Sequence, residues 1–196
     1  MNTWTRSRVE TALRDSAQIN EADWSGLDLA GVNLERKALV KVNLKGTCLS
    51  GANCTELALT NCDLSEALLS ETCLVQAKVI NSRLRGAILH GCDAGDSLFF
   101  DCDFTEGRLA RAKLRSTTFS RCALPGEVLA DVALCRQAAF DKCVLAGTSL
   151  RGRLEKTLFL NAICQELISP AVTWQIVYLA RARCPMQYGA MWWPMG

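Results

Sequence analysis

The segment Leu27-Asp28-Leu29-Ala30-Gly31 is followed at once by Val32-Asn33-Leu34-Glu35-Arg36, and Cys62-Asp63-Leu64-Ser65-Glu66 has the same pattern. Each segment has five residues, with Asp or Asn in the second place and leucine in the third. A period of five fits neither an α-helix, which repeats every 3.6 residues, nor a strand, which repeats every two. The backbone must therefore turn a corner after every five residues.

The five-residue pattern holds for most of the chain. Counted from Ala22, its third place is Leu or Phe almost throughout as far as Leu134, and its first place is usually small. The fifth place is often glycine or a charged residue. Four such sides would close a coil of about twenty residues, with the first and third places pointing inward. Because one coil cannot bury its own apolar face, neighbouring coils must stack at strand spacing, and the sequence predicts an all-β solenoid.

Two compensating shifts interrupt the register near the C-terminal end. Gln137 is one residue extra, and one residue is missing from the segment Thr148–Arg151. We expect a small bulge near Arg136–Ala138 and a tightened corner near Arg151. Stacking every fourth five then places four phenylalanines in one interior column: Phe99, Phe119, Phe140 and Phe159.

The repeating unit, roughly A-(D/N)-L-x-x, resembles the motif of the pentapeptide-repeat family over residues 17–168. The resemblance implies a right-handed quadrilateral β-helix, here of about seven coils. It also implies non-enzymatic proteins that act by binding other proteins. The best-known function in the family is mimicry of duplex DNA at type II topoisomerases such as DNA gyrase. Other members are secreted effectors, or repeats attached to type VI secretion proteins.

Both ends of the chain depart from the repeat. Residues 1–16 are predicted to form a short capping helix with Val9, Ala12 and Leu13 on one face. Residues 169–196 are predicted to form a C-terminal helix, begun by Ser169-Pro170, and an aromatic tail. The tail either folds back as a cap or contacts a partner. In the DNA-mimicking relatives a C-terminal helix joins two β-helices, so the resemblance favours a homodimer through this segment.

Composition excludes some partners and locations. The formal net charge is +2, too small to indicate nucleic acid or an anionic membrane, so we expect no membrane and no direct nucleic-acid binding. No run of about 18 apolar residues occurs, and the N-terminal residues lack the apolar core of a secretory signal. The expectation is a bacterial cytoplasmic protein, with export without a cleaved signal as the alternative.

Catalytic chemistry is not evident in the sequence. The single histidine, His90, falls in an outward place, and no nucleophile–base pair, phosphate-binding glycine loop or metal-ligand spacing stands out. We therefore predict no catalytic residue, no cofactor, no metal and no enzymatic activity.

The eleven cysteines are explained best by packing. Four of them fall in the first place of the same side: Cys62, Cys102, Cys122 and Cys143. A column of thiols would present ligands in a line, whereas zinc needs four around one point, so filling of tight inward sites is the preferred interpretation and metal chelation the alternative. Cys48, Cys73 and Cys135 are predicted to face outward and to react with thiol reagents.

Charge is distributed unevenly along the chain. Residues 1–107 carry fifteen acidic and ten basic residues, a net of −5, and residues 108–196 carry five acidic and twelve basic residues, a net of +7. Duplex DNA carries one negative charge per about 1.7 Å of axis, so a DNA mimic should be acidic along much of its length. The sequence therefore favours a protein-interaction scaffold or adaptor, associated with a bacterial secretion or effector system, over a DNA mimic that inhibits or protects gyrase.

The partner, another protein, is expected to bind outward residues. Scattered exposed apolar residues are ordinary, but a contiguous patch marks an interface. Ile80, Leu98 and Phe100 fall on adjacent coils, and Leu68 and Ile88 face outward on the neighbouring side. The complete set of partner-binding candidates is Ile80, Leu98, Phe100, Arg111, Arg115, Trp174, Tyr178, Trp192 and Trp193.

Overall fold

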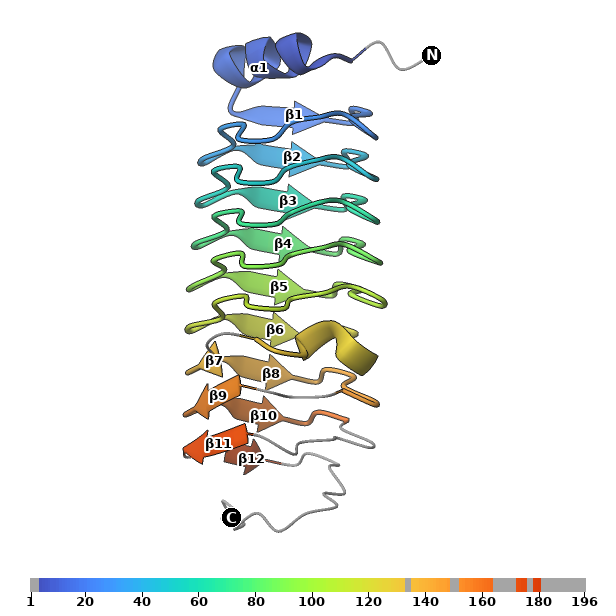
Figure 1. The fold of residues 1–196 in the computed structure, drawn as a ribbon. Helices are drawn as coiled ribbons and strands as arrows, with labels where there is room; N and C mark the ends of the chain where they lie inside the picture. Colours follow the sequence, from blue (N-terminus) through green and yellow to red (C-terminus); the bar gives the residue numbers. More distant parts are fainter. Residues whose placement is uncertain (1–3, 133–134, 149–151, 164–171, 176–177, 181–196) are drawn as a thin grey trace.

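The chain is a column of stacked coils with a helix across one end (Figure 1). The computed structural model describes residues 4–132, 135–148, 152–163, 172–175 and 178–180 of the 196-residue chain. Helix α1 spans Arg6–Asp15, and a 3-10 helix, η1, spans Gly126–Leu129. All strand pairs in the described residues are parallel. The predicted all-β solenoid of about seven coils is confirmed.

One side of each coil contributes a short strand to a continuous sheet. In sheet order the described strands are β1 (Gln18–Asn20), β2 (Ala38–Val40), β3 (Ala58–Thr60), β4 (Lys78–Ile80), β5 (Leu98–Phe100), β6 (Thr118–Ser120), β8 (Ala139–Asp141), β10 (Leu158–Leu160) and β12 (Tyr178–Ala180). We call this the first side. The second and third sides begin, in the N-terminal coil, with Asp23 and Asp28. The fourth begins with Asn33 and continues into β7 (Cys135–Arg136), β9 (Gly152–Glu155) and β11 (Val172–Gln175).

The second place of each five explains how the chain turns. The side-chain oxygen of Asp23 accepts a hydrogen bond from the backbone N–H of Ser25 (3.1 Å), and Asp63 does the same for Ser65 (2.9 Å). Asp and Asn form such local turns readily, which accounts for their recurrence in this place. The corner at the fifth place needs a positive φ, supplied without strain by Gly46 (φ 64°) and adopted by Glu66 (φ 61°) one coil later.

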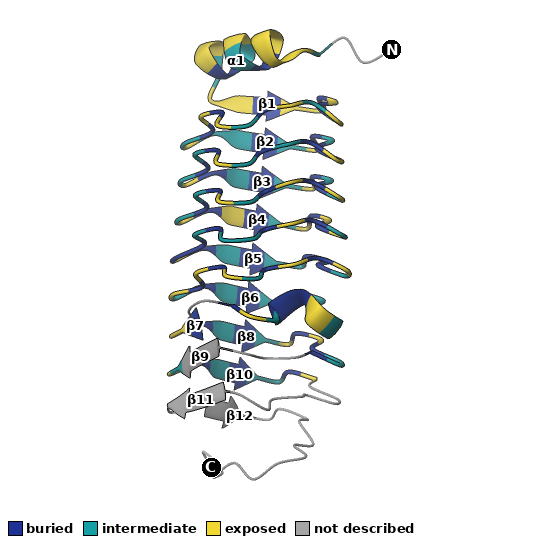
Figure 2. Cartoon of the chain, in the orientation of Figure 1, coloured by how far each residue is buried: buried dark blue, intermediate teal, exposed yellow. Residues whose placement is uncertain are grey.

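The interior is filled by the first and third places, as Figure 2 shows by the dark segments that recur in every coil. The predicted phenylalanine column is present: successive ring centroids of Phe99, Phe119, Phe140 and Phe159 lie 5.0, 5.1 and 5.0 Å apart and nearly parallel. Phe104 packs edge-on against two of these rings. Phe119 and Phe140 therefore each contact a phenylalanine on both neighbouring coils, which couples these coils, and Phe99 and Phe159 end the column.

The extra residue is accommodated before the predicted place. Leu109 N–H donates to Val128 O, nineteen residues on, whereas Arg111 N–H donates to Asp131 O, twenty residues on. Cys135 is buried, and Gln137 is an ordinary corner residue with φ 56°. The bulge predicted near Arg136–Ala138 is therefore wrongly placed, because the chain absorbs the insertion between Val128 and Asp131, at the end of η1.

The predicted shortening of the repeat by one residue is confirmed. The corner residues Gly147 (φ 67°) and Lys156 (φ 51°) are nine positions apart, where two fives would give ten. Phe159 consequently pairs with Phe140 at a separation of nineteen. The predicted tight corner at Arg151 lies outside the described residues.

The predicted N-terminal capping helix is present. The Thr5 side chain accepts a hydrogen bond from Arg8 N–H and caps α1, and Val9 and Leu13 are buried against the first coil. Lys37 donates to the carbonyls of Leu13 and Ser16 at the helix C-terminus, where a cation is favourable. None of the helices in the described residues is long and apolar enough to cross a membrane.

The predicted C-terminal helical cap is wrong where the structure describes that segment. Val172–Gln175 is strand β11 and Tyr178–Ala180 is strand β12. Trp174 pairs in register with Leu154, and Leu179 with Phe159. These residues keep the five-residue spacing, so pairing with the preceding coil prevails over the local helix-start signal at Ser169-Pro170. The remaining residues of the predicted tail lie outside the described part.

Candidate interaction surface

The fold brings three predicted apolar residues together on the first side. Ile80, at the end of β4, lies in register with Phe100, at the end of β5. Leu98 begins β5, so its side chain and that of Phe100 point away from the interior that Phe99 fills. All three outward side chains are half-buried. We call Ile80, Leu98 and Phe100 the apolar patch.

Positive charge borders the patch on the next coil. The guanidinium carbon of Arg121 lies 5.5 Å from the ring centroid of Phe100, and the same group is 3.2 Å from the Asp101 carboxylate. A cation over an aromatic face at an exposed site contributes about 0.5–1 kcal/mol. Arg121 therefore lies on the rim of the patch and limits the exposure of the Phe100 ring.

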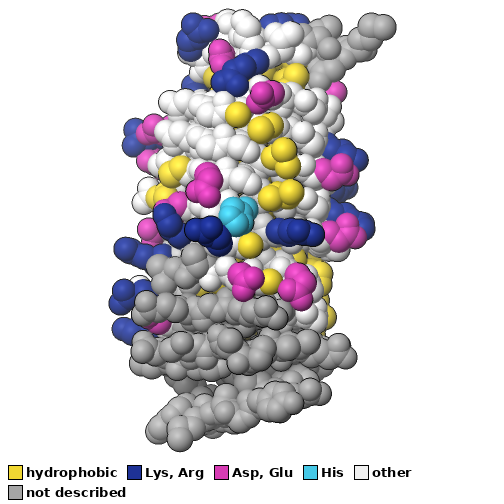
Figure 3. Space-filling model, in the orientation of Figure 1, with side chains coloured by type: hydrophobic (Ala, Val, Ile, Leu, Met, Phe, Trp, Pro, Cys, Tyr) yellow, Lys and Arg dark blue, Asp and Glu magenta, His cyan; other side chains and the backbone are white. Residues whose placement is uncertain are grey.

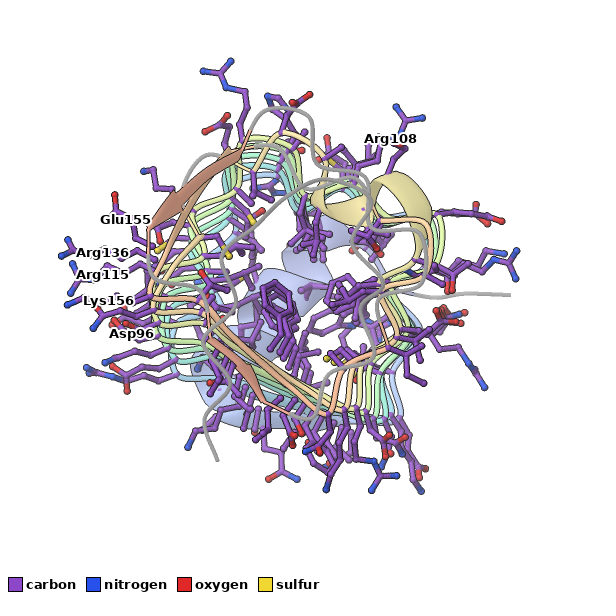
Figure 4. The ribbon with its side chains drawn as sticks, turned by 90° about the horizontal axis from the view of Figure 1, so that it is seen from below. Asp96, Arg108, Arg115, Arg136, Glu155 and Lys156 are labelled. Carbon is purple, nitrogen blue, oxygen red and sulfur yellow. The ribbon has the colours of Figure 1, made fainter. Side chains whose placement is uncertain are left out.

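A row of basic residues lies at the edge between the fourth and first sides. Arg115, Arg136 and Lys156 are on three successive coils and project from the same edge in Figure 4, where the acidic Asp96 and Glu155 project as well. Arg136 forms an ion pair with Glu155 (3.5 Å), whereas Arg115 and Lys156 have no ion-pair partner among the described residues. We call Arg115, Arg136 and Lys156 the basic edge.

Only Arg115 of this edge was predicted. The inserted residue lies between Arg115 and Arg136, so a strict count of fives does not align these two. Lys156 lies at the corner that follows their column, level with Gln137. Cys135 as an inward residue was the signal that could have located the shift correctly. The predicted Arg111 is exposed but lies at the opposite edge of the fourth side, across the buried residues Ala112 and Leu114.

The remaining predicted contacts are in the C-terminal segment. Trp174 belongs to β11 and Tyr178 to β12, strands of two different sheets. The orientation of their side chains, together with Trp192 and Trp193, lies outside the described residues. Their part in binding therefore stays a prediction.

Ion pairs connect adjacent coils along the outer surface. Each joins a basic and an acidic side chain 19 to 21 residues apart: Lys41–Glu21, Arg36–Glu56, Lys45–Glu66, Lys113–Asp93, Arg121–Asp101, Arg85–Glu106 and Arg136–Glu155. Exposed pairs of this kind stabilise a fold by about 0.2–1 kcal/mol each. Their larger effect here is electrostatic, because six of the seven neutralise acidic residues of the N-terminal half.

The cysteine column is a packing feature with its own hydrogen bonds. Cys62, Cys102, Cys122 and Cys143 are buried, and each thiol donates to a backbone carbonyl of the preceding coil at 3.3–3.4 Å. Ser82 occupies the position between Cys62 and Cys102 in this column, and its hydroxyl donates to the carbonyl of Ile80 (2.9 Å). In the described residues no group of three His, Cys, Asp or Glu side chains is arranged to hold a metal ion.

The three cysteines predicted to face outward do not behave alike. Cys48 and Cys73 are half-exposed, as expected. Cys135 is buried, so its predicted reactivity is wrong; the inserted residue moves it into a central place opposite Leu154. Burial raises the pKa of the Cys135 thiol to about 12, and those of Cys54 and Cys92 likewise to about 12.

These buried thiols should make the fold sensitive to alkali. Their folded-state pKa values lie above the ordinary value of about 8.5, so their contribution to stability is complete below that pH and is lost as pH rises towards 12. Between about pH 8.5 and pH 10 we expect a loss of about 1–2 kcal/mol per thiol in the free energy of unfolding. Urea denaturation under reducing conditions at several pH values measures this loss in the free energy of unfolding.

The control is the triple variant Cys54→Ala, Cys92→Ala and Cys135→Ala. Its free energy of unfolding should fall less steeply with pH than that of the natural sequence. An identical slope in the two proteins would assign the alkaline loss to other groups.

An open hollow of about 510 Å³ lies between α1 and the first coil. Arg6, Glu10, Arg14 and Lys37 contribute to its lining. Arg6 already pairs with Glu10 (2.9 Å), and Lys37 is bound to the carbonyls at the end of α1. These contacts fasten the cap to the coil, so we assign the hollow to the junction rather than to a ligand.

Comparisons with known proteins agree with this architecture. A family model described as pentapeptide repeats (8 copies) matches residues 39–74, 47–86 and 62–99. HetL, a pentapeptide repeat protein involved in heterocyst differentiation regulation from the cyanobacterium Nostoc sp. strain PCC 7120, has a similar structure. The two are 19% identical with a TM-score of 0.63, over 93% of this chain and 98% of HetL.

A second similar structure is trypsin-treated QnrB1, a plasmid-mediated fluoroquinolone resistance protein. It is 16% identical with a TM-score of 0.51, over 83% of each chain. No curated protein matches the sequence. At these identities the structural likeness concerns the fold alone. The repeat in the sequence, the family model and the four-sided coil agree, and the chain belongs to the pentapeptide-repeat family.

Proposed function

We propose that this protein is a non-enzymatic protein-interaction scaffold, whose first side binds a partner with an apolar, acid-bordered surface. The observation that carries the proposal is the contiguous apolar patch on β4 and β5, with the basic edge along the same side of the solenoid. A partner is bound best when an apolar centre is excluded from water and complementary charges surround it. The patch supplies the centre, and Arg115, Arg121 and Lys156 supply positive charge around it.

The stacked interior supports a binding role over catalysis. In the described residues, the inward places carry aliphatic, aromatic and small side chains, and the chemistry-bearing Asp93, Asp96, Asp101 and Asp103 lie on different sides or corners of one coil. Asp93 and Asp101 are engaged with Lys113 and Arg121. The surface is therefore suited to recognition. An adaptor or effector role in a bacterial secretion system is consistent with the proposal.

The alternative of DNA mimicry at gyrase is less well supported. Such a protein needs a largely uninterrupted acidic face. Six acidic residues of the first half are instead paired with Lys or Arg on an adjacent coil: Glu21, Glu56, Glu66, Asp93, Asp101 and Glu106. The likeness to QnrB1 is one of fold. A supercoiling assay in which low micromolar protein inhibits or protects gyrase would favour mimicry over the scaffold.

The test of the scaffold is the variant Phe100→Asp. A carboxylate in place of the ring should weaken partner binding by about 2 kcal/mol or more, because it removes the apolar centre and must be desolvated, while the neighbouring Arg121 is already paired with Asp101. Affinity purification from the native cell with the natural sequence as bait, followed by mass spectrometry, identifies the partner, and titration then compares the two proteins.

Val40→Asp is the matched control, because Val40 occupies the same outward column of the first side, two coils from Ile80, the nearest residue of the patch. It should bind the partner normally. Both variants should melt within a few degrees of the natural protein. Unchanged binding by Phe100→Asp would exclude the patch, and equal loss in both variants would point to a nonspecific effect of negative charge.

A further inference from the structure

A second exposed column lies on the third side, opposite the apolar patch. It consists of the second-place residues Asp28, Cys48, Leu68, Ile88 and Arg108, each paired in parallel register with the next. Leu68 and Ile88 are 40% and 36% exposed, among the most exposed large apolar side chains in the described residues. Figure 3 shows hydrophobic side chains in a column on this face, beside the single histidine. We call the five residues the third-side ladder.

The order of residues in the ladder is self-complementary. Leu68 is in the middle, an apolar residue lies on each side of it, and the ends carry opposite charges. A rotation of 180° about an axis along the Leu68 strand would place Asp28 of one copy against Arg108 of a second copy, and Leu68 against Leu68. We propose that this chain self-associates through the third-side ladder, with the two solenoids antiparallel.

Charge selects the antiparallel arrangement. A parallel pair would keep the central Leu68 contact but would oppose Asp28 to Asp28 and Arg108 to Arg108, and such like-charge juxtaposition is costly. In the antiparallel pair the contact between Asp28 and Arg108 forms twice, once at each end of the ladder, as a two-fold interface requires. Asp28 accepts a hydrogen bond from Ala30 N–H through one carboxylate oxygen only (3.0 Å). Arg108, which points outward in Figure 4, has no ion-pair partner among the described residues.

The neighbouring column leaves room for this contact. It contains the fourth-place residues Ala30, Ser50, Ser70, His90 and Ala110. Under the same rotation Ala30 meets Ala110, Ser50 meets His90, and Ser70 meets Ser70. Large or like-charged side chains are thus not opposed in this column. The ladder and this column can therefore approach over four coil steps, about 19 Å. The exposed Glu66 and Glu71, at the two corners level with Leu68, would each face their own counterpart at the rim of the contact.

The expected association is weak and depends on concentration. One side of a narrow solenoid buries less than the roughly 1,200 Å² of a standard stable interface. The inference goes beyond the proposed partner binding, and neither depends on the other. Because the first and third sides are on opposite faces of the coil, such a pair would leave an apolar patch exposed on each copy.

Sedimentation velocity of the full chain, from about 1 to about 500 μM, is the test, since a weak interface needs this range. The natural sequence should show reversible dimers. Leu68→Asp should weaken the dimer by about a hundredfold, because two carboxylates would meet at the axis. Val144→Asp is the matched control: Val144 is 41% exposed on the second side and should have no effect.

Charge reversal tests the orientation. Asp28→Arg and Arg108→Asp should each weaken the dimer by about tenfold, since each changes two contacts from attraction to repulsion. The double variant should recover the natural affinity. A strictly monomeric natural protein, or a dimer unaffected by Leu68→Asp, would overturn the proposal. Loss of dimer in Leu68→Asp with no response to either single reversal would overturn the antiparallel geometry.

Discussion

Replacing Phe119 by alanine should lower the free energy of unfolding by about 3–5 kcal/mol, the cost of removing a fully buried ring. Phe119 is 0% exposed and stacks on Phe99 and Phe140, with Phe104 edge-on at 5.8 Å. Its removal leaves a cavity between two coils, and coil-to-coil contacts are the interactions that hold a solenoid together.

The loss of stability should be confined to the coils on one side of the substitution. Because each repeat contacts only its neighbours, coils beyond Thr118 should uncouple from the N-terminal ones and unfold at lower denaturant concentration. Chemical denaturation gives the magnitude, and amide hydrogen exchange detected by mass spectrometry gives the location. Phe100→Ala is the control, since the same residue type on the outside of the adjacent strand should cost about 1 kcal/mol or less. Equal losses in the two variants would show that the ring column does not couple the coils.

Replacing Val9 by aspartate should release the N-terminal cap. Val9 is 0% exposed, and Val9 and Leu13 are the buried contacts of α1 with the first coil. A carboxylate there would be buried without a partner, so the helix should detach, and a ten-residue helix is not stable alone. Losing two buried aliphatic side chains should cost about 3–5 kcal/mol.

The released cap should expose the edge of the first coil. Trp24, now fully buried and packed edge-on against Trp4 at 5.9 Å, would meet solvent, and unpaired strand groups would favour aggregation. Circular dichroism should show loss of the helical signal, and light scattering should rise with time. Thr11→Asp, on the exposed face of α1, should do neither. A Val9→Asp protein that keeps its helix and stays monodisperse would show that other contacts hold the cap.

Most of the fold was predictable because its cause is local and repeated. A leucine or phenylalanine in every third place must be buried, and Asp23 or Asp63 in the second place forms its turn from its own backbone. The errors occurred where the repeat is interrupted. The inserted residue could be absorbed at several positions, and the backbone pairing of Arg111 with Asp131 after that of Leu109 with Val128 decides among them. The Ser169-Pro170 signal favoured a helix, yet strand pairing with the coil already formed is worth more.

The candidate surfaces were predictable only in part. Ile80, Leu98 and Phe100 follow from the period, because adjacent coils are twenty residues apart there. The basic edge does not, because Arg136 shares the column of Arg115 only after the inserted residue is placed, and Lys156 lies at the next corner, level with Gln137.

Outside the interrupted segment that contains Cys135, the sequence by itself determined which residues face inward, and therefore the four-sided coil, the phenylalanine and cysteine columns and the N-terminal cap. The tertiary structure alone decided how outward residues from different coils meet: the pairing of acidic with basic side chains, the place of the inserted residue and the strands that continue past Ser169. The reason is physical. Inward places are fixed by burial, which acts on each five separately, whereas outward contacts depend on the stacking register, which only the assembled coil defines.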